Sequence, residues 1–196
     1  MKTLEFFFDV GSAASYLAYT QLPKLARETG ATIDYKPMLL GGVFQATGNH
    51  SPMTIAAKAR YVARDFGRFA KRYGVPMANN PHFPIITLNL QRGATALQMH
   101  EPARFLPYLD AVFGSIWVDA RNMNDPATVA DVLSRAGFDP AALLARTQEA
   151  QVKERLKAVT QDAIERGVFG APTFFVGKQM FWGQDRLDFV KEALQS

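Results

Sequence analysis

The order of strand-like and helix-like segments constrains the fold of this chain more than any other feature of its sequence. Residues 3–10 form a short Phe-rich run that is typical of a buried strand, and residues 12–28 carry apolar side chains at roughly helical spacing. Residues 33–37 then alternate like a second strand and end at a proline. A strand, a helix and a strand in this order form a βαβ unit, so we expect the two strands to be parallel neighbours.

Strand patterns return near the end of the chain. Residues 172–176 and 179–181 are separated by the turn Gly177-Lys178, which predicts a β-hairpin. Residues 185–194 follow as a closing helix, with Asp185 in the position of its N-terminal cap. The C-terminal part therefore has the order ββα.

A long helical block separates these two strand-containing parts. Residues 41–166 show mostly helical periodicity, and residues 79–84 belong to the main irregular loop within them. A segment of this length is too long for a connecting loop. We therefore expect an α/β fold in which residues 1–40 and 167–196 form one discontinuous domain and residues 41–166 form an inserted helical subdomain.

The composition excludes several classes of protein and site. The chain contains no cysteine, which excludes disulfides, thiol catalysis and cysteine metal sites. Its histidines, His50, His82 and His100, lack the spacing of a metal-binding pair, so we expect no metal site. The net charge of +4 is spread along the chain and predicts no nucleic-acid partner. Without a signal-peptide pattern or an apolar run of about 20 residues, the sequence predicts a cytoplasmic protein with no membrane partner.

Two turns carry residues that are suited to chemistry. The segment Ser12-Ala13-Ala14-Ser15 directly follows the first strand, where a serine is typical of a helix N-cap. In Gly170-Ala171-Pro172-Thr173 a proline opens a strand. The pattern is compatible with an ordinary trans proline, and also with a cis bond that leaves the backbone groups of Ala171 facing a cleft.

The βαβ–ββα order together with Pro172 resembles the thioredoxin fold with a helical insertion, as in the DsbA-like branch. In that fold a cis-proline lies opposite the start of the first helix, and Ser12 and Ser15 here occupy the positions of its two cysteines. A closer resemblance, over nearly the whole chain, is to the glutathione-dependent 2-hydroxychromene-2-carboxylate isomerases and the related kappa-class glutathione transferases. The matching segments are Phe8-Asp9, Ser12, Ser15-Tyr16, Lys36-Pro37, Leu40 to Phe44, Gly48-Asn49, Pro52, Tyr73 to Pro76, Phe83-Pro84, Val168 to Phe174 and Trp182 to Arg186.

The resemblance implies a glutathione cofactor, which would supply the sulfur that this chain lacks. The catalytic residue would be Ser12, whose hydroxyl would donate a hydrogen bond to the glutathione thiolate at the positive end of the first helix. The backbone of Ala171, held outward by Pro172, would pair with the cysteinyl backbone of glutathione. The alternative for Ser12 is that it serves only as a helix cap.

The other end of glutathione, its γ-glutamyl group, is expected near the start of the last helix. Asp185 would bind its ammonium group, and backbone N–H groups near Gln184 and Asp185 would bind its carboxylate. Trp182 would form a wall of the site, and Gly183 would let the backbone approach the ligand closely. A plain helix cap at Asp185 and a core position for Trp182 are the alternatives.

The activity that the resemblance implies is a glutathione-dependent isomerisation between 2-hydroxychromene-2-carboxylate and trans-o-hydroxybenzylidenepyruvate, or of a related intermediate of aromatic catabolism. This small aromatic carboxylate would bind between the sheet domain and the helical insert, near Phe44, Asn49 and Phe83. A kappa-class-like glutathione transferase or peroxidase and a non-catalytic binding module are the alternatives. The resemblance further implies a homodimer.

Overall fold

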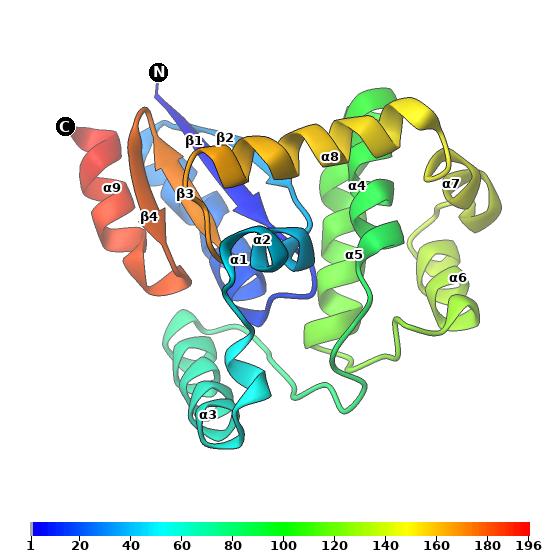
Figure 1. The fold of residues 1–196 in the computed structure, drawn as a ribbon, viewed down its shortest axis with the longest axis horizontal. Helices are drawn as coiled ribbons and strands as arrows, with labels where there is room; N and C mark the ends of the chain where they lie inside the picture. Colours follow the sequence, from blue (N-terminus) through cyan, green and yellow to red (C-terminus); the bar gives the residue numbers. More distant parts are fainter. Residues whose placement is uncertain (1) are drawn as a thin grey trace.

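The computed structural model describes residues 2–196 and contains a four-stranded mixed sheet (Figure 1). The strands are β1 (Thr3–Phe8), β2 (Thr32–Pro37), β3 (Thr173–Val176) and β4 (Gln179–Trp182), in the spatial order β2-β1-β3-β4. β1 and β2 run parallel, whereas β3 is antiparallel to β1 and to β4. The predicted βαβ unit and C-terminal hairpin are therefore confirmed.

The central strand β1 is buried on both faces, which explains why it reads as a nearly continuous apolar run. Phe6 belongs to the core cluster that includes side chains of α1 and α9. Phe7 points the opposite way, into a second cluster with side chains of α2 and α8. The helices of these two layers are α1 (Ala13–Thr29), α2 (Leu40–Thr47), α8 (Ala150–Glu165) and α9 (Leu187–Gln195).

The helices between β2 and β3 extend the molecule away from the sheet, with α4 to α7 on the right of Figure 1 and α3 below the sheet. Besides α2 and α8 they are α3 (Ala56–Tyr73), α4 (Leu88–His100), α5 (Phe105–Trp117), α6 (Pro126–Arg135) and α7 (Pro140–Arg146). Because α2 and α8 also cover one face of the sheet, the division of the chain at residues 40/41 and 166/167 stays a prediction.

The topology brings two distant turns together at one end of the sheet. Phe7 of β1 lies opposite Thr173 of β3, so the turn that follows β1 and the turn that precedes β3 are neighbours. The aromatic ring of Phe6 holds this pairing, because it stacks on Phe174 with 5.3 Å between ring centroids and on Phe8 with 5.0 Å. No helix in residues 2–196 is both long and apolar enough to cross a membrane.

Candidate active site

Ser12 lies in the turn between β1 and α1, at one end of the sheet. Its backbone is extended (φ −97°, ψ 115°), and its Oγ accepts a hydrogen bond from the Ser15 N–H at 3.1 Å. The predicted N-cap is therefore confirmed. The same hydroxyl donates to the carbonyl oxygen of Ala171 at 3.2 Å and keeps 9% of its residue surface exposed. The cap thus leaves the hydroxyl proton directed across the turn, toward the start of β3.

The turn opposite Ser12 contains the Ala171–Pro172 peptide bond, which is cis, as the resemblance implies. The Ala171 carbonyl accepts the bond from Ser12, and the Pro172 carbonyl accepts one from the Gly183 N–H at 3.0 Å. Within residues 2–196 the Ala171 N–H has no hydrogen-bond partner. The structure therefore brings Ser12 and Ala171 into direct contact across 159 positions of the chain.

Trp182 ends β4 beside this turn and is 49% exposed, so its placement as a core residue is excluded. Its ring centroid lies 4.9 Å from that of Phe169. A Cβ added to Gly170 would lie 2.5 Å from Trp182 Nε1, so the indole packs directly on the backbone that leads to Ala171. This position beside Ala171 suits the wall that we predict, and the binding role itself stays a prediction.

The segment after β4 differs from the predicted helix cap. Residues Gln184–Arg186 form a 3-10 turn, and α9 begins only at Leu187. Asp185 accepts no hydrogen bond from the first turn of α9, and its carboxylate pairs instead with Arg186 at 2.6 Å. The capping role of Asp185 is therefore wrong, because the tighter turn places its side chain outside the helix start. Within residues 2–196 the backbone N–H groups of Gln184 and Asp185 have no partners.

Gly183 requires the backbone freedom of glycine. Its φ of 104° with ψ of 147° lies where other residues are strained, and an added Cβ would lie 2.6 Å from the Oδ1 atom of Asp185. The side chain of Asp185 therefore folds closely over the backbone of Gly183. This contact places the carboxylate beside Gly183, the residue that follows β4.

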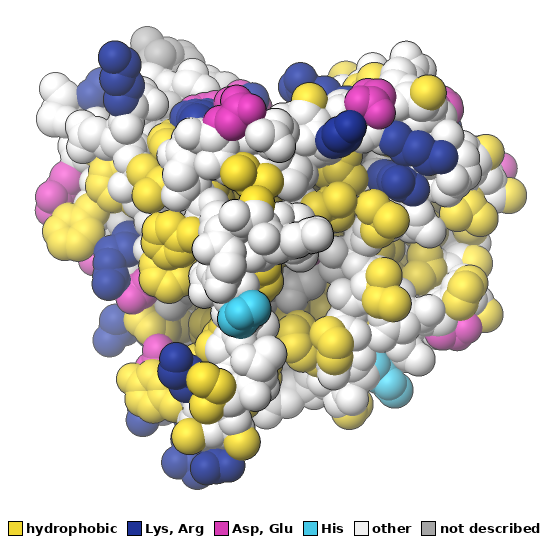
Figure 2. Space-filling view, viewed as in Figure 1, with side chains coloured by type: hydrophobic (Ala, Val, Ile, Leu, Met, Phe, Trp, Pro, Cys, Tyr) yellow, Lys and Arg dark blue, Asp and Glu magenta, His cyan; other side chains and the backbone are white. Residues whose placement is uncertain are grey.

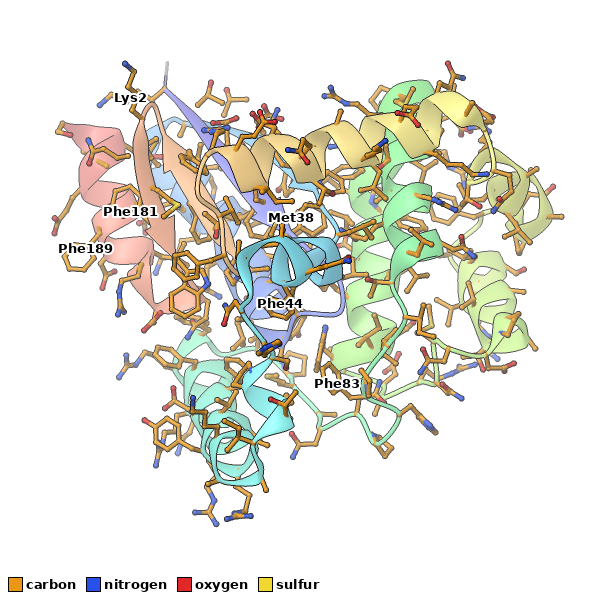
Figure 3. The ribbon with its side chains drawn as sticks, viewed as in Figure 1. Lys2, Met38, Phe44, Phe83, Phe181 and Phe189 are labelled. Atoms are coloured by element: carbon orange, nitrogen blue, oxygen red, sulfur yellow. The ribbon has the colours of Figure 1, made fainter. Side chains whose placement is uncertain are left out.

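The three predicted substrate residues lie on two segments, the region of α2 and the irregular loop before α4. Phe44 is a half-buried residue of α2, and Phe83 is half-buried on the irregular loop before α4, with its ring 6.1 Å from that of Trp117 (Figure 3). Figure 2 shows hydrophobic side chains around a hollow beside α2 on this face. Asn49 uses its amide to donate to the Phe169 carbonyl at 2.8 Å. It therefore ties the end of α2 to the segment before Pro172, and its substrate role stays a prediction.

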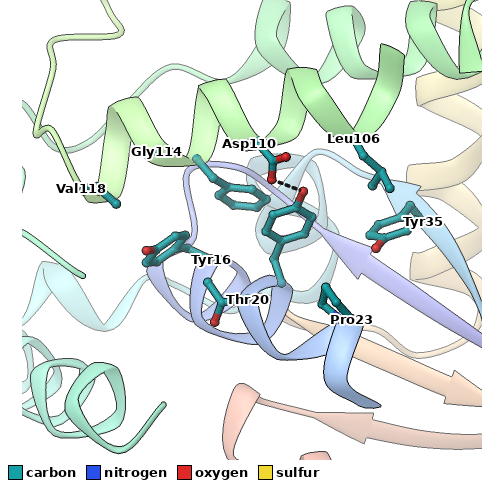
Figure 4. A pocket seen from close by; sticks show the side chains of 10 residues that line it. Tyr16, Thr20, Pro23, Tyr35, Leu106, Asp110, Gly114 and Val118 are labelled. Carbon is teal, nitrogen blue, oxygen red and sulfur yellow. Dashed lines mark hydrogen bonds between the residues drawn. The ribbon is translucent and has the colours of Figure 1, made fainter. Parts of the chain in front are cut away.

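A separate cleft of about 450 Å³ lies between α1 and α5 (Figure 4). Tyr19 crosses it and donates to Asp110 Oδ1 at 2.6 Å. Burial and this carboxylate raise the pKa of Tyr19, and burial raises the pKa of Tyr35 in the same cleft to about 12. None of the predicted site residues lines this cleft.

Comparisons with known proteins connect this geometry to a family. The DSBA-like thioredoxin domain family matches residues 3–195. A 2-hydroxychromene-2-carboxylate isomerase from Sphingobium xenophagum is 36% identical over 98% of each chain. The chain belongs to this isomerase family. The solved structure of a 2-hydroxychromene-2-carboxylate isomerase aligns with a TM-score of 0.86 at 31% identity, covering 98% of this chain and 94% of that one. Glutathione S-transferase kappa 1 from Rattus norvegicus is 26% identical over 98% of this chain and 91% of its own.

The predicted fold class and family are therefore confirmed: this member of the isomerase family has a thioredoxin-like βαβ–ββα core with a helical insertion.

Two residues near the site were not among the predicted site residues. Tyr73, at the end of α3, donates to the backbone oxygen of Gln184 at 3.0 Å and is 2.7 Å from its Oε1. Burial raises the pKa of Tyr73 to about 12, so it stays protonated as a donor. The only indication of Tyr73 in the sequence was its place in the Tyr73-Gly74-Val75-Pro76 motif.

Asp9 is the second residue that we did not predict in the site. It lies just before the Ser12 turn, is 3% exposed, and accepts hydrogen bonds from Gly11, Leu40 and Thr87. Burial raises the pKa of its carboxyl group, and these three bonds offset part of that effect. The Phe8-Asp9 motif at the end of the first strand was the available signal, but the hydrogen-bond partners of Asp9 lie too far along the chain to be predicted.

The pH dependence of stability should report this buried carboxyl group. Because the folded state raises the pKa of Asp9 above its unfolded value of about 3.9, its contribution is present at low pH and is lost as pH rises through the raised pKa. We expect the unfolding free energy of the wild type, minus that of Asp9→Asn, to fall as pH rises from about 4 and then to level off. Urea denaturation of both proteins across this range measures the difference; a difference that rises with pH contradicts this prediction.

Ser15 offers a contrasting substitution within the same turn. Its hydroxyl is buried and is without a hydrogen-bond partner in residues 2–196, and only its backbone N–H bonds to Ser12. We expect Ser15→Ala to raise the unfolding free energy by about 1 kcal/mol, because alanine is the better helix former and leaves no unsatisfied hydroxyl. Denaturant unfolding measures this change. A clear loss of stability would mean that the Ser15 hydroxyl has a partner.

Proposed function

We propose that this protein isomerises 2-hydroxychromene-2-carboxylate to trans-o-hydroxybenzylidenepyruvate, or a related intermediate of aromatic catabolism, with glutathione as its cofactor. The observation that supports this most strongly is the 36% identity to a named isomerase across 98% of both chains. The opposed turns at Ser12 and Ala171 add support, because they form a polar site in a chain that lacks cysteine.

The residues at this site suit the chemistry of glutathione. The tripeptide has a peptide backbone, which the partnerless Ala171 N–H can bind, and a terminal carboxylate, which the N–H groups of Gln184 and Asp185 can bind. Its ammonium group suits the carboxylate of Asp185. In the structure this carboxylate forms an ion pair with another cation, Arg186. These groups lie on the backbone that surrounds Pro172 and Gly183, which are joined by a hydrogen bond.

Glutathione held by these residues would supply a thiolate nucleophile, whose reversible addition to the conjugated carbon chain of the substrate would turn the double bond into a single bond that can rotate. Ser12 would stabilise the negative sulfur by donating a hydrogen bond from its hydroxyl group, which in the structure donates to the Ala171 oxygen. The first N–H groups of α1 add a favourable dipole at the same place. Phe44 and Phe83 exclude water from the planar substrate and contact its ring.

The experiment that tests this proposal follows substrate and free thiol together. Purified protein is mixed with 2-hydroxychromene-2-carboxylate at increasing glutathione concentrations, and the isomer and the remaining thiol are quantified. We expect a rate that requires glutathione and saturates with it, while the amount of free thiol stays constant. A rate that is independent of glutathione would overturn the cofactor assignment.

A kappa-class-like transferase or peroxidase is the second candidate, because the rat kappa relative aligns over 98% of this chain. It differs in stoichiometry, since conjugation or oxidation consumes one or more thiols for each product. Loss of free thiol in step with turnover would favour this candidate. A protein that binds glutathione without turnover would instead be a binding module.

We also propose that the protein works as a homodimer in the cytoplasm. Both proposals rest on the family to which the chain belongs. Light scattering on the purified protein measures its mass in solution against the 21.7 kDa of one chain. A single-chain mass would contradict the dimer, and recovery outside the cytoplasmic fraction of its cells would contradict the location.

A further inference from the structure

One buried carboxyl group holds three separate segments at the site. Asp9 Oδ1 accepts the Gly11 N–H at 2.9 Å, directly before Ser12. Its Oδ2 accepts the Leu40 N–H at 3.0 Å and the Thr87 hydroxyl at 3.1 Å. Leu40 and Thr87 lie 31 and 78 positions away along the chain. The carboxyl group therefore links three segments that are far apart along the chain.

The two distant partners of Asp9 border the segments that carry Phe44 and Phe83. Leu40 is the first residue of α2, and Phe44 lies one turn further along that helix. Thr87 is the N-cap position of α4 and follows the loop that carries Phe83. A shift of the Asp9 carboxyl would thus change the position of both walls relative to the Ser12 turn.

The packing at this point leaves little room for adjustment. A Cβ added to Gly11 would lie 2.8 Å from the Thr87 Cγ2 atom, so the turn rests directly on the start of α4. The Asp9 carbonyl also accepts the Ser12 N–H at 2.9 Å. Movement of Asp9 is therefore transmitted to the backbone of Ser12.

Stability alone does not explain a carboxyl group at this position. Burial raises its pKa, which means that the folded protein bears a cost for keeping it ionised. All three of its hydrogen-bond partners are donors, two N–H groups and one hydroxyl, so they suit an ionised acceptor. A neutral side chain would carry a smaller desolvation cost but could not accept all three bonds in this geometry.

We propose that Asp9 is a positioning residue that fixes the Ser12 turn against both walls of the substrate site through Leu40 and Thr87. The proposal rests on the isomerase function proposed above. Asp9 acts through these segments and touches neither substrate nor cofactor. Its effect should therefore appear in turnover more than in the binding of glutathione, because every predicted glutathione contact except Ser12 lies on the Ala171 and Asp185 side.

The central variant is Asp9→Asn, which keeps the shape of the side chain but replaces one acceptor oxygen by a donor. Gln91 of α4 should preserve the fold, because its amide donates to the Phe8 and Met38 carbonyls at 2.9 and 2.8 Å. We expect kcat to fall by about 100-fold, the effect of a misplaced reacting group, while KM for glutathione changes by less than about threefold. An unchanged kcat in a folded variant would overturn the proposal.

Thr87 provides a milder pair of variants if Asp9→Asn does not fold. Thr87→Val keeps the shape but removes the hydroxyl donor, whereas Thr87→Ser keeps the donor. We expect kcat to fall several-fold, on the order of 10-fold, in Thr87→Val and to be largely restored in Thr87→Ser. The control is Thr95→Val, because Thr95 lies on the same helix and its buried hydroxyl donates a hydrogen bond to the Gln91 carbonyl oxygen and not to Asp9. Equal loss of kcat in Thr87→Val and Thr95→Val would overturn the positioning role.

A readout that does not need turnover separates this proposal from the proposed function. Amide hydrogen exchange, measured by NMR, should speed up at both Gly11 and Leu40 in Asp9→Asn and at neither in Thr95→Val. If the wild type lacks isomerase activity, the proposed function fails, while coupled exchange at the two amides would still establish the link through Asp9. Unchanged exchange at both amides would overturn the link itself.

Discussion

Ser12→Ala is expected to lower the rate of isomerisation by about 10- to 100-fold while the protein stays folded. A hydrogen bond to a charged group contributes roughly 1.5–3 kcal/mol. Loss of the hydrogen bond that stabilises the thiolate would raise the activation free energy by this amount, which corresponds to a rate decrease of about 10- to 100-fold. The Ser12 hydroxyl is placed for this role, because it lies at the start of α1 and donates its hydrogen bond across the turn to Ala171.

The variant also removes the N-cap of α1, so we expect a loss of about 1 kcal/mol of unfolding free energy. Initial rates with saturating glutathione, together with urea unfolding, separate the two effects. Ser15→Ala is the matched control, since it removes a hydroxyl from the same helical turn that has no partner in residues 2–196. An unchanged rate in Ser12→Ala would remove Ser12 from the mechanism.

Phe6→Ala is expected to lower the unfolding free energy by about 3–5 kcal/mol, the largest effect on stability that we predict. The Phe6 side chain is fully buried, stacks on Phe8 and Phe174, and meets Tyr35 edge-on at 6.0 Å. Its loss would open a cavity between β1, β3 and α1. The same contact aligns the strands whose ends carry Ser12 and Pro172.

Phe189→Ala is the control for this prediction, because Phe189 on α9 is 55% exposed. We expect its effect on stability to stay within about 0.5 kcal/mol. Urea denaturation followed by circular dichroism measures both variants. A loss below about 1 kcal/mol in Phe6→Ala would show that the sheet core repacks around the missing ring.

Local sequence patterns predicted most of the strands and turns, because these elements depend on the conformational preferences of neighbouring residues. The Phe-rich run of β1 and the hairpin turn at Gly177-Lys178 have strand and turn preferences of their own. The short helix α2 was not predicted as a separate element, because Gly41 and Gly42 in its first turn are poor helix formers and tertiary contacts with α8 and the sheet stabilise it. The cap at Asp185 failed for a similar reason, since a 3-10 turn cannot be distinguished from a helix start in one sequence.

The sequence predicted the residues of the two turns in the candidate site but missed two residues whose roles depend on distant partners. Ser12 and Ala171 follow from recognisable turns, and the structure brings them into contact. Asp9 and Tyr73 were missed because their roles depend on partners more than 30 and 100 positions away along the chain. Periodicity carries no information about such pairs.

The central claim is that the reactive sulfur of this enzyme comes from glutathione and is held as a thiolate at Ser12. The most direct measurement is calorimetric titration of the wild type with glutathione and with S-methylglutathione, each in two buffers of different ionisation enthalpy. We predict that both ligands bind and that only glutathione releases a proton, because its thiol ionises at the site. Absence of glutathione binding, or binding with no proton release, would contradict the claim.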